Sequence, residues 1–332
     1  ASYPRFDPNE PVRAKPDLDR RMNHPVSVPF EPGSVFKIIT VSAALETTRL
    51  VPDTIIPCGS GSMRLFGRVI RDHHAYSSLS MADVLAKSSN IGAINVGLRV
   101  GEERLLDYVR RFGFGQLTGI PLPAESAGMV RDLDAWGKTS IGSVAMGHEI
   151  SVTTIQLARA VSVIANGGLL VEPRLILKHQ RPGHEPVTDP VKPARRVIKP
   201  ETAITMRQLM ERVVLHGTGR LARLDGYTAG GKTGSAQIFD LEQRRYTHEY
   251  NASFIGFAPV TIPAIAVVVT LNGAKKFGGA VAAPVFREVA TAALRLADVP
   301  KDLPDVPPTI REDEPVDFDD LAIADLGSLA PS

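Results

Sequence analysis

Apolar residues follow two different periods along this chain, and the period changes near residue 230. Before that point, apolar positions recur at helical spacing and predict helices from Ser34 to about Thr48, from Glu102 to Phe112 and from Pro200 to about His216. After it, alternation with period two predicts three consecutive antiparallel strands and a closing helix, at 235–239, 253–257, 264–271 and 284–296. The pattern therefore predicts an α/β (α+β) fold in which helices flank an antiparallel β-sheet.

Helix-start and helix-stop signals are dense between about residues 80 and 166, which predicts a mainly helical subdomain there. Ser80-Met81-Ala82-Asp83 fits a capping box and opens a helix that runs to Asn90, with a second short helix from Ile91 to Leu98. Thr153 or Thr154 caps a helix that ends at Asn166-Gly167-Gly168. We expect an extended lead-in at 1–30 and a strand pair at 169–177, broken by Pro173.

Composition and charge narrow the class of protein. With 43% hydrophobic and 22% charged residues among 332, the chain is globular. Its net charge of +2 hides an asymmetry, because 301–332 carries nine acidic and two basic residues, which leaves the remainder at +9. This divides the chain into a body at 1–300 and an acidic, Pro-containing tail or linker at 301–332. A basic body suits an anionic neighbourhood such as a membrane surface or a wall polymer.

Several classes of function find no support in the residues. No basic run is interleaved with aromatic residues, so we expect no nucleic-acid partner. The longest apolar run, Ala264 to Leu271, is too short to cross a bilayer, and residue 1 opens no signal-peptide pattern; any signal or anchor would lie upstream. Cys58 is the single cysteine and is expected to be a buried, inert thiol. The pairs His73-His74 and His148-Glu149 lack ligand spacing, so we expect neither a metal nor a cofactor.

The stretch Glu31-Pro32-Gly33-Ser34-Val35-Phe36-Lys37 is the first candidate for chemistry. Ser34 follows a Pro-Gly turn at a helix start, where unpaired N–H groups and the positive end of the helix dipole favour an anion. Residues three apart on a helix share a face, which places Lys37 within reach of Ser34. This motif predicts a serine nucleophile with a lysine base, although an ordinary N-cap serine beside an exposed lysine has the same pattern.

Two further polar motifs follow. Ser88-Ser89-Asn90, at a break between apolar helices, offers a hydroxyl and an amide for chemistry. An ordinary polar turn between two helices would have the same sequence pattern. Gly230-Gly231-Lys232-Thr233-Gly234-Ser235 opens a strand, where small residues let a ligand lie along the sheet edge and Lys232 would supply a fixed positive charge.

The third motif also matches a nucleotide phosphate loop, beginning at Gly226 and ending at Thr233. That loop needs a hydrophobic strand before it and a helix after it. Leu221 to Asp225 is too short and polar for such a strand, and 235–239 alternates as a strand should. We therefore favour a strand-edge site over a nucleotide site.

The three motifs S-x-x-K, S-x-N and K-[ST]-G occur in an order typical of penicillin-recognising serine enzymes. The chain resembles the transpeptidase domain of a class B penicillin-binding protein, most closely the cell-division type, over about residues 3–300. Further segments carry the likeness: 112–115, 118–123, 151–153, 156–160, 165–168, 217–219, 253–259 and 282–286. Two departures stand out: Ser235 replaces the more usual Thr, and 145–149 lacks the usual Gly-Gln-Gly, which leaves the role of this loop open.

The resemblance implies a penicilloyl-serine transferase fold and a peptidoglycan D,D-transpeptidase that β-lactams acylate. Ser34 would be the nucleophile, Lys37 the general base, Ser88 a proton relay and Asn90 a ligand for the substrate amide. Thr233, Gly234 and Ser235 would bind the terminal carboxylate with Lys232, and the N–H groups of Ser34 and Ser235 would form the oxyanion hole.

The same resemblance implies where the protein works and with what. The partners would be a D-Ala-D-Ala stem peptide, an amine acceptor and β-lactams, with membrane division or glycosyltransferase proteins bound through N-terminal regions outside this chain. The domain would lie on the extracytoplasmic side of a bacterial membrane, take part in septal wall synthesis, and lack its anchor and pedestal domain here. A D,D-carboxypeptidase or β-lactam sensor of the same superfamily is the alternative; a class A hydrolase is disfavoured, because no Glu-x-x-Leu-Asn lies between Ser88 and Lys232.

Overall fold

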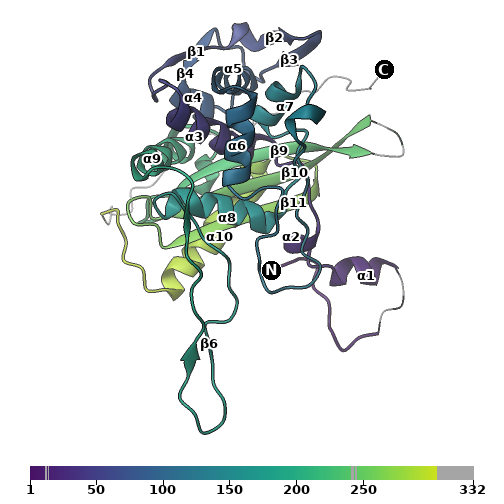
Figure 1. Cartoon of the computed structure of the whole chain (residues 1–332), viewed down its shortest axis with the longest axis vertical. Helices are drawn as coiled ribbons and strands as arrows, with labels where there is room; N and C mark the ends of the chain where they lie inside the picture. Colours follow the sequence, from purple (N-terminus) through teal and green to yellow (C-terminus); the bar gives the residue numbers. More distant parts are fainter. Residues whose placement is uncertain (12, 14, 241–242, 244, 305–332) are drawn as a thin grey trace, which may run out of the picture.

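A three-stranded antiparallel sheet forms the centre of the protein (Figure 1). The structure, a computed structural model, describes residues 1–304 except 12, 14, 241, 242 and 244. Strands β9 (Gly230–Asp240), β10 (Arg245–Ala258) and β11 (Ile265–Ala274) are ordered β11-β10-β9. The three predicted strands are confirmed, and each is longer than the alternation indicated. Strand β9 lies at the edge of this sheet, and this edge carries the Lys232 motif.

Helices cover both faces of the sheet because side chains of β10 alternate between them. Phe254 and Ala258 pack in one core cluster with Phe286 of α10 (Gly278–Leu296). Ile255 and Phe257 belong to the larger cluster on the other face, with residues of α3 (Lys37–Thr47), α8 (Thr154–Ala165) and α9 (Pro200–His216). Helix α10 begins six residues before the predicted start at Pro284: Phe277 is its N-cap, and the proline lies inside the helix.

The predicted helical subdomain contains α4 (Met81–Ala86), α5 (Asn90–Val100), α6 (Glu102–Arg111) and α7 (Ser140–Met146). The Ser80 hydroxyl caps α4 by accepting a hydrogen bond from the Asp83 N–H at 3.0 Å. Thr153 rather than Thr154 caps α8, in a full capping box with Gln156. Helix α7 was not predicted, because it has only seven residues and Gly142 interrupts its apolar pattern.

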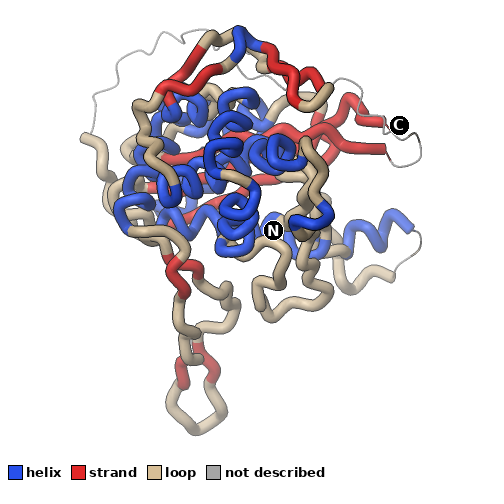
Figure 2. Tube along the Cα trace, turned by 45° about the horizontal axis from the view of Figure 1, so that its top comes forward, coloured by secondary structure: helices blue, strands red, loops and turns tan. Residues whose placement is uncertain are grey.

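The periphery consists of short elements. The strand pairs are β1 (Ile55–Pro57) with β4 (Ser78–Ser80), β2 (Ser62–Leu65) with β3 (Arg68–Arg71), β5 (Leu169–Leu170) with β8 (Arg195–Arg196), and β6 (Lys178–His179) with β7 (Val187–Thr188). The 3-10 helices are η1 (Gly33–Phe36), η2 (Gly59–Gly61), η3 (Leu133–Ala135) and η4 (Arg220–Ala222). The hairpin that carries β6 and β7 projects far from the body (Figures 1 and 2).

Two peripheral predictions were wrong. The lead-in contains α1 (Lys15–Arg21) and α2 (His24–Ser27), so it is not extended throughout. The expected strand pair at 169–177 is absent among the described residues: β5 has only two residues and pairs with β8, far beyond Pro173. Within the described ranges no helix is both long and apolar enough to cross a bilayer. Residues 305–332, most of the expected acidic tail, lie outside the described residues.

Candidate active site

The first motif forms a rigid turn at the start of α3. Ser34 lies in η1, and α3 begins at Lys37, so the predicted helix start is confirmed with a 3-10 first turn. Val35 and Phe36 are fully buried, whereas Ser34 keeps part of its surface accessible. The Ser34 N–H lies in the first turn of this helix, where amide groups have no intrahelical acceptor. The turn therefore holds Ser34 at the start of the helix while leaving part of the residue accessible.

Lys37 connects this turn to the second motif. Its side chain is fully buried, and its Nζ donates to the Ser88 carbonyl oxygen at 2.5 Å and to Asn90 Oδ1 at 2.7 Å. The Ser88 hydroxyl lies 3.3 Å from the same nitrogen. The competing interpretation of an exposed lysine beside an N-cap serine is therefore wrong, because the Lys37 amino group is held inside the protein.

The third motif reaches the same hydroxyl from the sheet. Lys232 is fully buried on β9, and its Nζ donates to Ser88 Oγ at 2.8 Å and to the Thr233 carbonyl oxygen at 3.0 Å. Ser88 adopts a left-handed backbone conformation with φ of 60°, which is uncommon for a residue other than glycine and concentrates at functional sites. The structure thus brings all three predicted motifs together around Ser88.

Burial decides the charge state of the two lysines. Desolvation lowers the pKa of Lys37 to about 7, against the opposing effect of the Asp72 carboxylate, which raises it. Desolvation and the positive charge of Lys37 together lower the pKa of Lys232 well below its ordinary value. A neutral amine is therefore available at neutral pH, and the charge of Lys232 depends on its surroundings rather than being fixed.

Asp72, which the sequence analysis did not identify, holds the second motif in place. Its Oδ1 accepts hydrogen bonds from the Asn90 N–H at 2.5 Å and the Ile91 N–H at 3.1 Å, and its Oδ2 accepts one from the Ser89 hydroxyl. A carboxylate at the N-terminus of α5 satisfies free N–H groups and favours the helix dipole. Asp72 follows strand β3, and no local spacing relates it to Asn90.

Cys58 lies next to Ser89, whose hydroxyl contacts both the Cys58 thiol and the Asp72 carboxylate. The thiol is buried, and desolvation raises its pKa, which confirms the expected buried thiol.

Strand β9 packs directly against the nucleophile turn. A Cβ added to Gly234 would lie 2.8 Å from Val35 Cγ1 and 3.1 Å from the Pro32 carbonyl oxygen, so only glycine fits here. A Cβ added to Gly33 would lie 3.2 Å from Ala236 Cβ, so residues 234–236 of β9 run alongside residues 32–35. The sequence analysis assigned an oxyanion hole to the N–H groups of Ser34 and Ser235. That role remains a prediction.

The expected substrate-binding residues divide between the two faces of β9. Lys232 pairs with Ile255, whereas Ser235 pairs with Ala252 and so shares its face with Thr233. Ser235 Oγ accepts a hydrogen bond from the Gly278 N–H at 2.9 Å, and the Thr218 and Thr233 hydroxyls lie 2.6 Å apart. Because an N–H occupies a lone pair of Ser235 Oγ, its own hydrogen is left to donate to an anion.

The geometry argues against the nucleotide alternative. Residues 230–240 form one continuous strand, so the Gly-Gly-Lys-Thr segment makes no loop that leads into a helix. Helix N–H groups are thus not available to hold a phosphate at this position.

Comparison with known proteins places residues 1–291 in correspondence with the penicillin binding protein transpeptidase domain. The penicillin-binding protein PbpB of Mycolicibacterium smegmatis is 36% identical over 311 residues, which cover 89% of this chain and 47% of that protein. Stage V sporulation protein D of Bacillus subtilis is 36% identical over 293 residues, covering 86% of this chain and 45% of that protein. This chain spans about half the length of these curated relatives.

Solved structures agree with these sequence matches. Penicillin binding protein 3 of Mycobacterium tuberculosis, complexed with ampicillin, superposes with a TM-score of 0.79 and 34% identity, covering 86% of this chain and 66% of that one. The transpeptidase domain of penicillin-binding protein 3 from Burkholderia pseudomallei gives a TM-score of 0.76 and 33% identity, covering 86% of this chain and 84% of that one.

Proposed function

We propose that this chain, which belongs to the family of penicillin-binding protein transpeptidase domains, is a serine D,D-transpeptidase that cross-links peptidoglycan stem peptides and is acylated by β-lactams. One observation carries the proposal. Two buried lysines from separate segments of the chain converge on the Ser88 hydroxyl, and one of them, Lys37, three residues after Ser34, also donates to Asn90. Such a cluster combines a low-pKa base with a proton relay, as nucleophilic catalysis requires.

In the first half of the reaction Ser34 would become acylated. Its Oγ attacks the carbonyl carbon of the penultimate D-Ala, and neutral Lys37 takes the hydroxyl proton. The C–N bond then breaks, and the terminal D-Ala leaves as an amine that receives a proton through Ser88. Because Ser88 Oγ lies 3.3 Å from Lys37 Nζ and 2.8 Å from Lys232 Nζ, it is placed to pass that proton between the base and the leaving group.

In the second half an amine from a neighbouring stem peptide takes the acyl group. The amine attacks the ester carbonyl, the ester C–O bond breaks, and Ser34 recovers its proton while a new amide forms. The N–H groups of Ser34 and Ser235 stabilise the oxyanion in both halves. Removing one such donor typically costs about 10²–10³ in rate.

The terminal carboxylate of the donor would bind where Lys232, Thr233 and Ser235 line β9. An anion near Lys232 favours the charged form of this lysine and raises its pKa again. Substrate binding would thereby charge Lys232 while Lys37 stays neutral, so each lysine has a separate role. Asn90, whose Oδ1 accepts from Lys37, would present its amide group to the substrate backbone.

The place of action follows from the substrate. Peptidoglycan lies outside the bacterial cytoplasmic membrane, so the domain would act on the extracytoplasmic side, within a membrane-anchored protein. We further propose a septal role with membrane-bound division or glycosyltransferase partners, supported by the similarity to PbpB and Stage V sporulation protein D.

Intact-mass spectrometry after incubation with a penicillin tests the proposal. Wild-type protein should gain the mass of one penicillin, and the variant Ser34→Ala should gain none. A folded wild-type protein that forms no adduct would contradict the proposed function.

Product analysis with a D-Ala-D-Ala peptide, with and without an amine acceptor, separates transfer from hydrolysis. A new amide product indicates a transpeptidase, hydrolysis alone a carboxypeptidase, and stable acylation by penicillin without peptide turnover a β-lactam sensor.

A further inference from the structure

The loop after α7, whose role the sequence left open, is bonded to the chain immediately before Ser34. Phe30 and Val152 exchange two backbone hydrogen bonds of 2.9 Å each, and the Gly33 N–H donates to the Gly147 carbonyl oxygen at 3.0 Å. A Cβ on Gly147 would clash with the Gly33 carbonyl group, so glycine is required for this close approach. Residues 147–152 therefore pair with residues 30–33, one residue short of Ser34.

Glu31 reinforces this pairing with its side chain. Its Oε1 accepts a hydrogen bond from the Glu149 N–H at 2.9 Å, and its Oε2 lies 3.0 Å from His148 Nδ1. Glu149 has a φ of 60°, a left-handed conformation that directs its N–H toward Glu31. One carboxylate thus binds two successive residues of the loop, in the place of the Gly-Gln-Gly that the family usually has.

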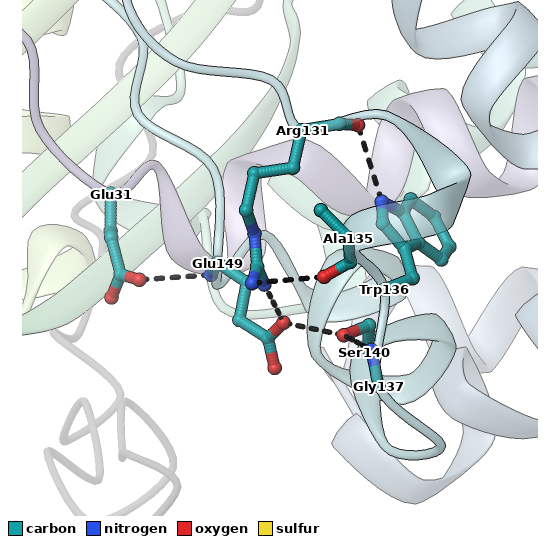
Figure 3. Close-up of polar contacts among 7 residues, drawn as sticks. All are labelled: Glu31, Arg131, Ala135, Trp136, Gly137, Ser140 and Glu149. Atoms are coloured by element: carbon teal, nitrogen blue, oxygen red, sulfur yellow. Dashed lines mark hydrogen bonds and ion pairs between the residues drawn. The ribbon is translucent and has the colours of Figure 1, made fainter.

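The loop is also anchored on its far side (Figure 3). The Glu149 carboxylate pairs with the Arg131 guanidinium group and accepts a hydrogen bond from the Ser140 hydroxyl at 2.7 Å. Arg131 also donates to the Ala135 carbonyl oxygen at 3.3 Å, and Ser140 is the first residue of α7. Glu149 therefore links the helical subdomain, through its carboxylate, to the chain before Ser34, through its N–H.

We propose that Glu31, His148 and Glu149 form a nucleophile brace, in which Glu31 is a positioning residue that orients Ser34 for acylation. The inference rests on the proposed function, since it assigns the brace to the reaction of Ser34. Rates of acyl transfer depend steeply on the direction of the attacking oxygen, and a misplacement of about 1 Å costs about 10²-fold. The brace ends three residues before Ser34 and crosses Pro32, which transmits its position with little freedom in φ.

The position of Glu31 favours a positioning role over a purely structural one. Its side chain is 30% exposed and that of His148 is 14% exposed, and neither belongs to the hydrophobic clusters of the core. The two hydrogen bonds between Phe30 and Val152 are made by backbone groups, so replacing the Glu31 side chain should leave them in place. We therefore expect a change in reactivity rather than a loss of folding.

The test measures the rate of acylation at several penicillin concentrations. This gives the acylation rate constant separately from the affinity of the non-covalent complex that precedes it. Glu31→Ala should lower the rate constant about 10–100-fold, with affinity unchanged within about twofold and the melting temperature close to wild type. Glu31→Gln should restore most of the rate, because its amide oxygen still accepts from the Glu149 N–H. His148→Asn should be faster than His148→Ala, because an amide N–H can replace the ring Nδ1.

Glu185→Ala is the matched control, since it removes an exposed carboxylate from the projecting hairpin. It should leave the rate constant unchanged. Full acylation activity in Glu31→Ala would overturn the brace. A loss that follows the melting temperature and is not restored by Glu31→Gln would also overturn it, because it would indicate a structural role.

Hydrogen exchange distinguishes failure of the brace from failure of the proposed function. Amides of 31–36 should exchange faster in Glu31→Ala than in wild type, even if penicillin does not react. A wild type without an adduct would contradict the function. Unchanged exchange in Glu31→Ala would contradict the brace, whatever the outcome with penicillin.

Discussion

Acylation of Ser34 by a β-lactam should depend on pH through the protonation of Lys37. The base must be neutral to accept the serine proton, and burial lowers the pKa of Lys37 from 10.5 to about 7. Below that value the rate constant should fall about tenfold for each pH unit, because the neutral fraction falls in that proportion. Above it the rate should reach a plateau.

The size of the effect follows from the two pKa values. At pH 7 a lysine with a pKa of about 7 is about half neutral, whereas one at 10.5 is neutral in about three molecules per 10⁴. Burial therefore raises the neutral fraction of Lys37 roughly 10³-fold at pH 7. Lowering the pKa from 10.5 to about 7 corresponds to a free energy of about 5 kcal/mol, since each pH unit is worth about 1.4 kcal/mol.

This gain in base has a cost in folding stability, with a definite sign. The folded pKa lies below the unfolded one, so between pH 7 and 10.5 the unfolded chain binds one more proton than the folded chain at this residue. The contribution of Lys37 to the free energy of unfolding therefore falls as the pH falls from 10.5 to 7, and is constant below 7. Keeping Lys37 neutral therefore lowers the free energy of unfolding near physiological pH.

Stopped-flow measurement of the acylation rate constant from pH 5.5 to 9, with a chromogenic β-lactam, is the assay. Because Lys37 and Lys232 interact, the midpoint belongs to the pair rather than to either residue alone. Far-UV circular dichroism across the same range controls for unfolding. A rate constant that is flat from pH 5.5 to 9, or one that still rises tenfold per unit at pH 9, would refute the assignment of Lys37 as the base.

Two further substitutions test neighbouring parts of the site. Asp72→Asn should move the midpoint of the pH profile to lower pH, because the Asp72 charge raises the pKa of Lys37. The amide oxygen of the new side chain would still accept a hydrogen bond from the Asn90 N–H. An unmoved or raised midpoint would contradict this coupling. Thr218→Val removes the hydroxyl that lies 2.6 Å from that of Thr233. It should weaken binding of a D-Ala-D-Ala peptide about 3–10-fold, as expected for the loss of about 1 kcal/mol of hydrogen bonding, and leave the acylation rate constant unchanged. Steady-state kinetics with the peptide measures the binding, and the penicillin assay measures the rate constant.

Much of the fold was predictable because its signals are local. The strand alternation after residue 230 and the caps at Ser80 and Thr153 each act over a few residues, and the structure confirms them. Helix α7, which was not predicted, contains Gly142 within its apolar pattern, and we infer that it is stabilised by packing against α5 rather than by its own sequence. Tertiary contacts of this kind leave no periodic signal.

The site shows the same division between local and distant information. Helical spacing placed Lys37 on the face of Ser34, but the contacts that define its state come from Ser88 and Asn90, more than 50 residues away. Asp72 was missed because it reaches α5 from the end of a peripheral hairpin, and the brace because Glu31 and Glu149 are 118 residues apart. Residue types indicated the chemistry, whereas the pKa of the base depends on burial that only the fold provides.

The charges of the site are unbalanced until an anion binds. Two lysines contact Ser88, and one partly accessible carboxylate, Asp72, binds the next two residues, Ser89 and Asn90. The interior does not readily hold two uncompensated ammonium groups. The free protein responds by losing a proton from this pair, which keeps a base ready near pH 7. Under the proposed function, a substrate or β-lactam would bring the missing carboxylate to β9, and its binding would favour the charged form of Lys232 without requiring Lys37 to be protonated. Selectivity for a terminal carboxylate and activation of Ser34 would then both follow from burying the same pair of lysines.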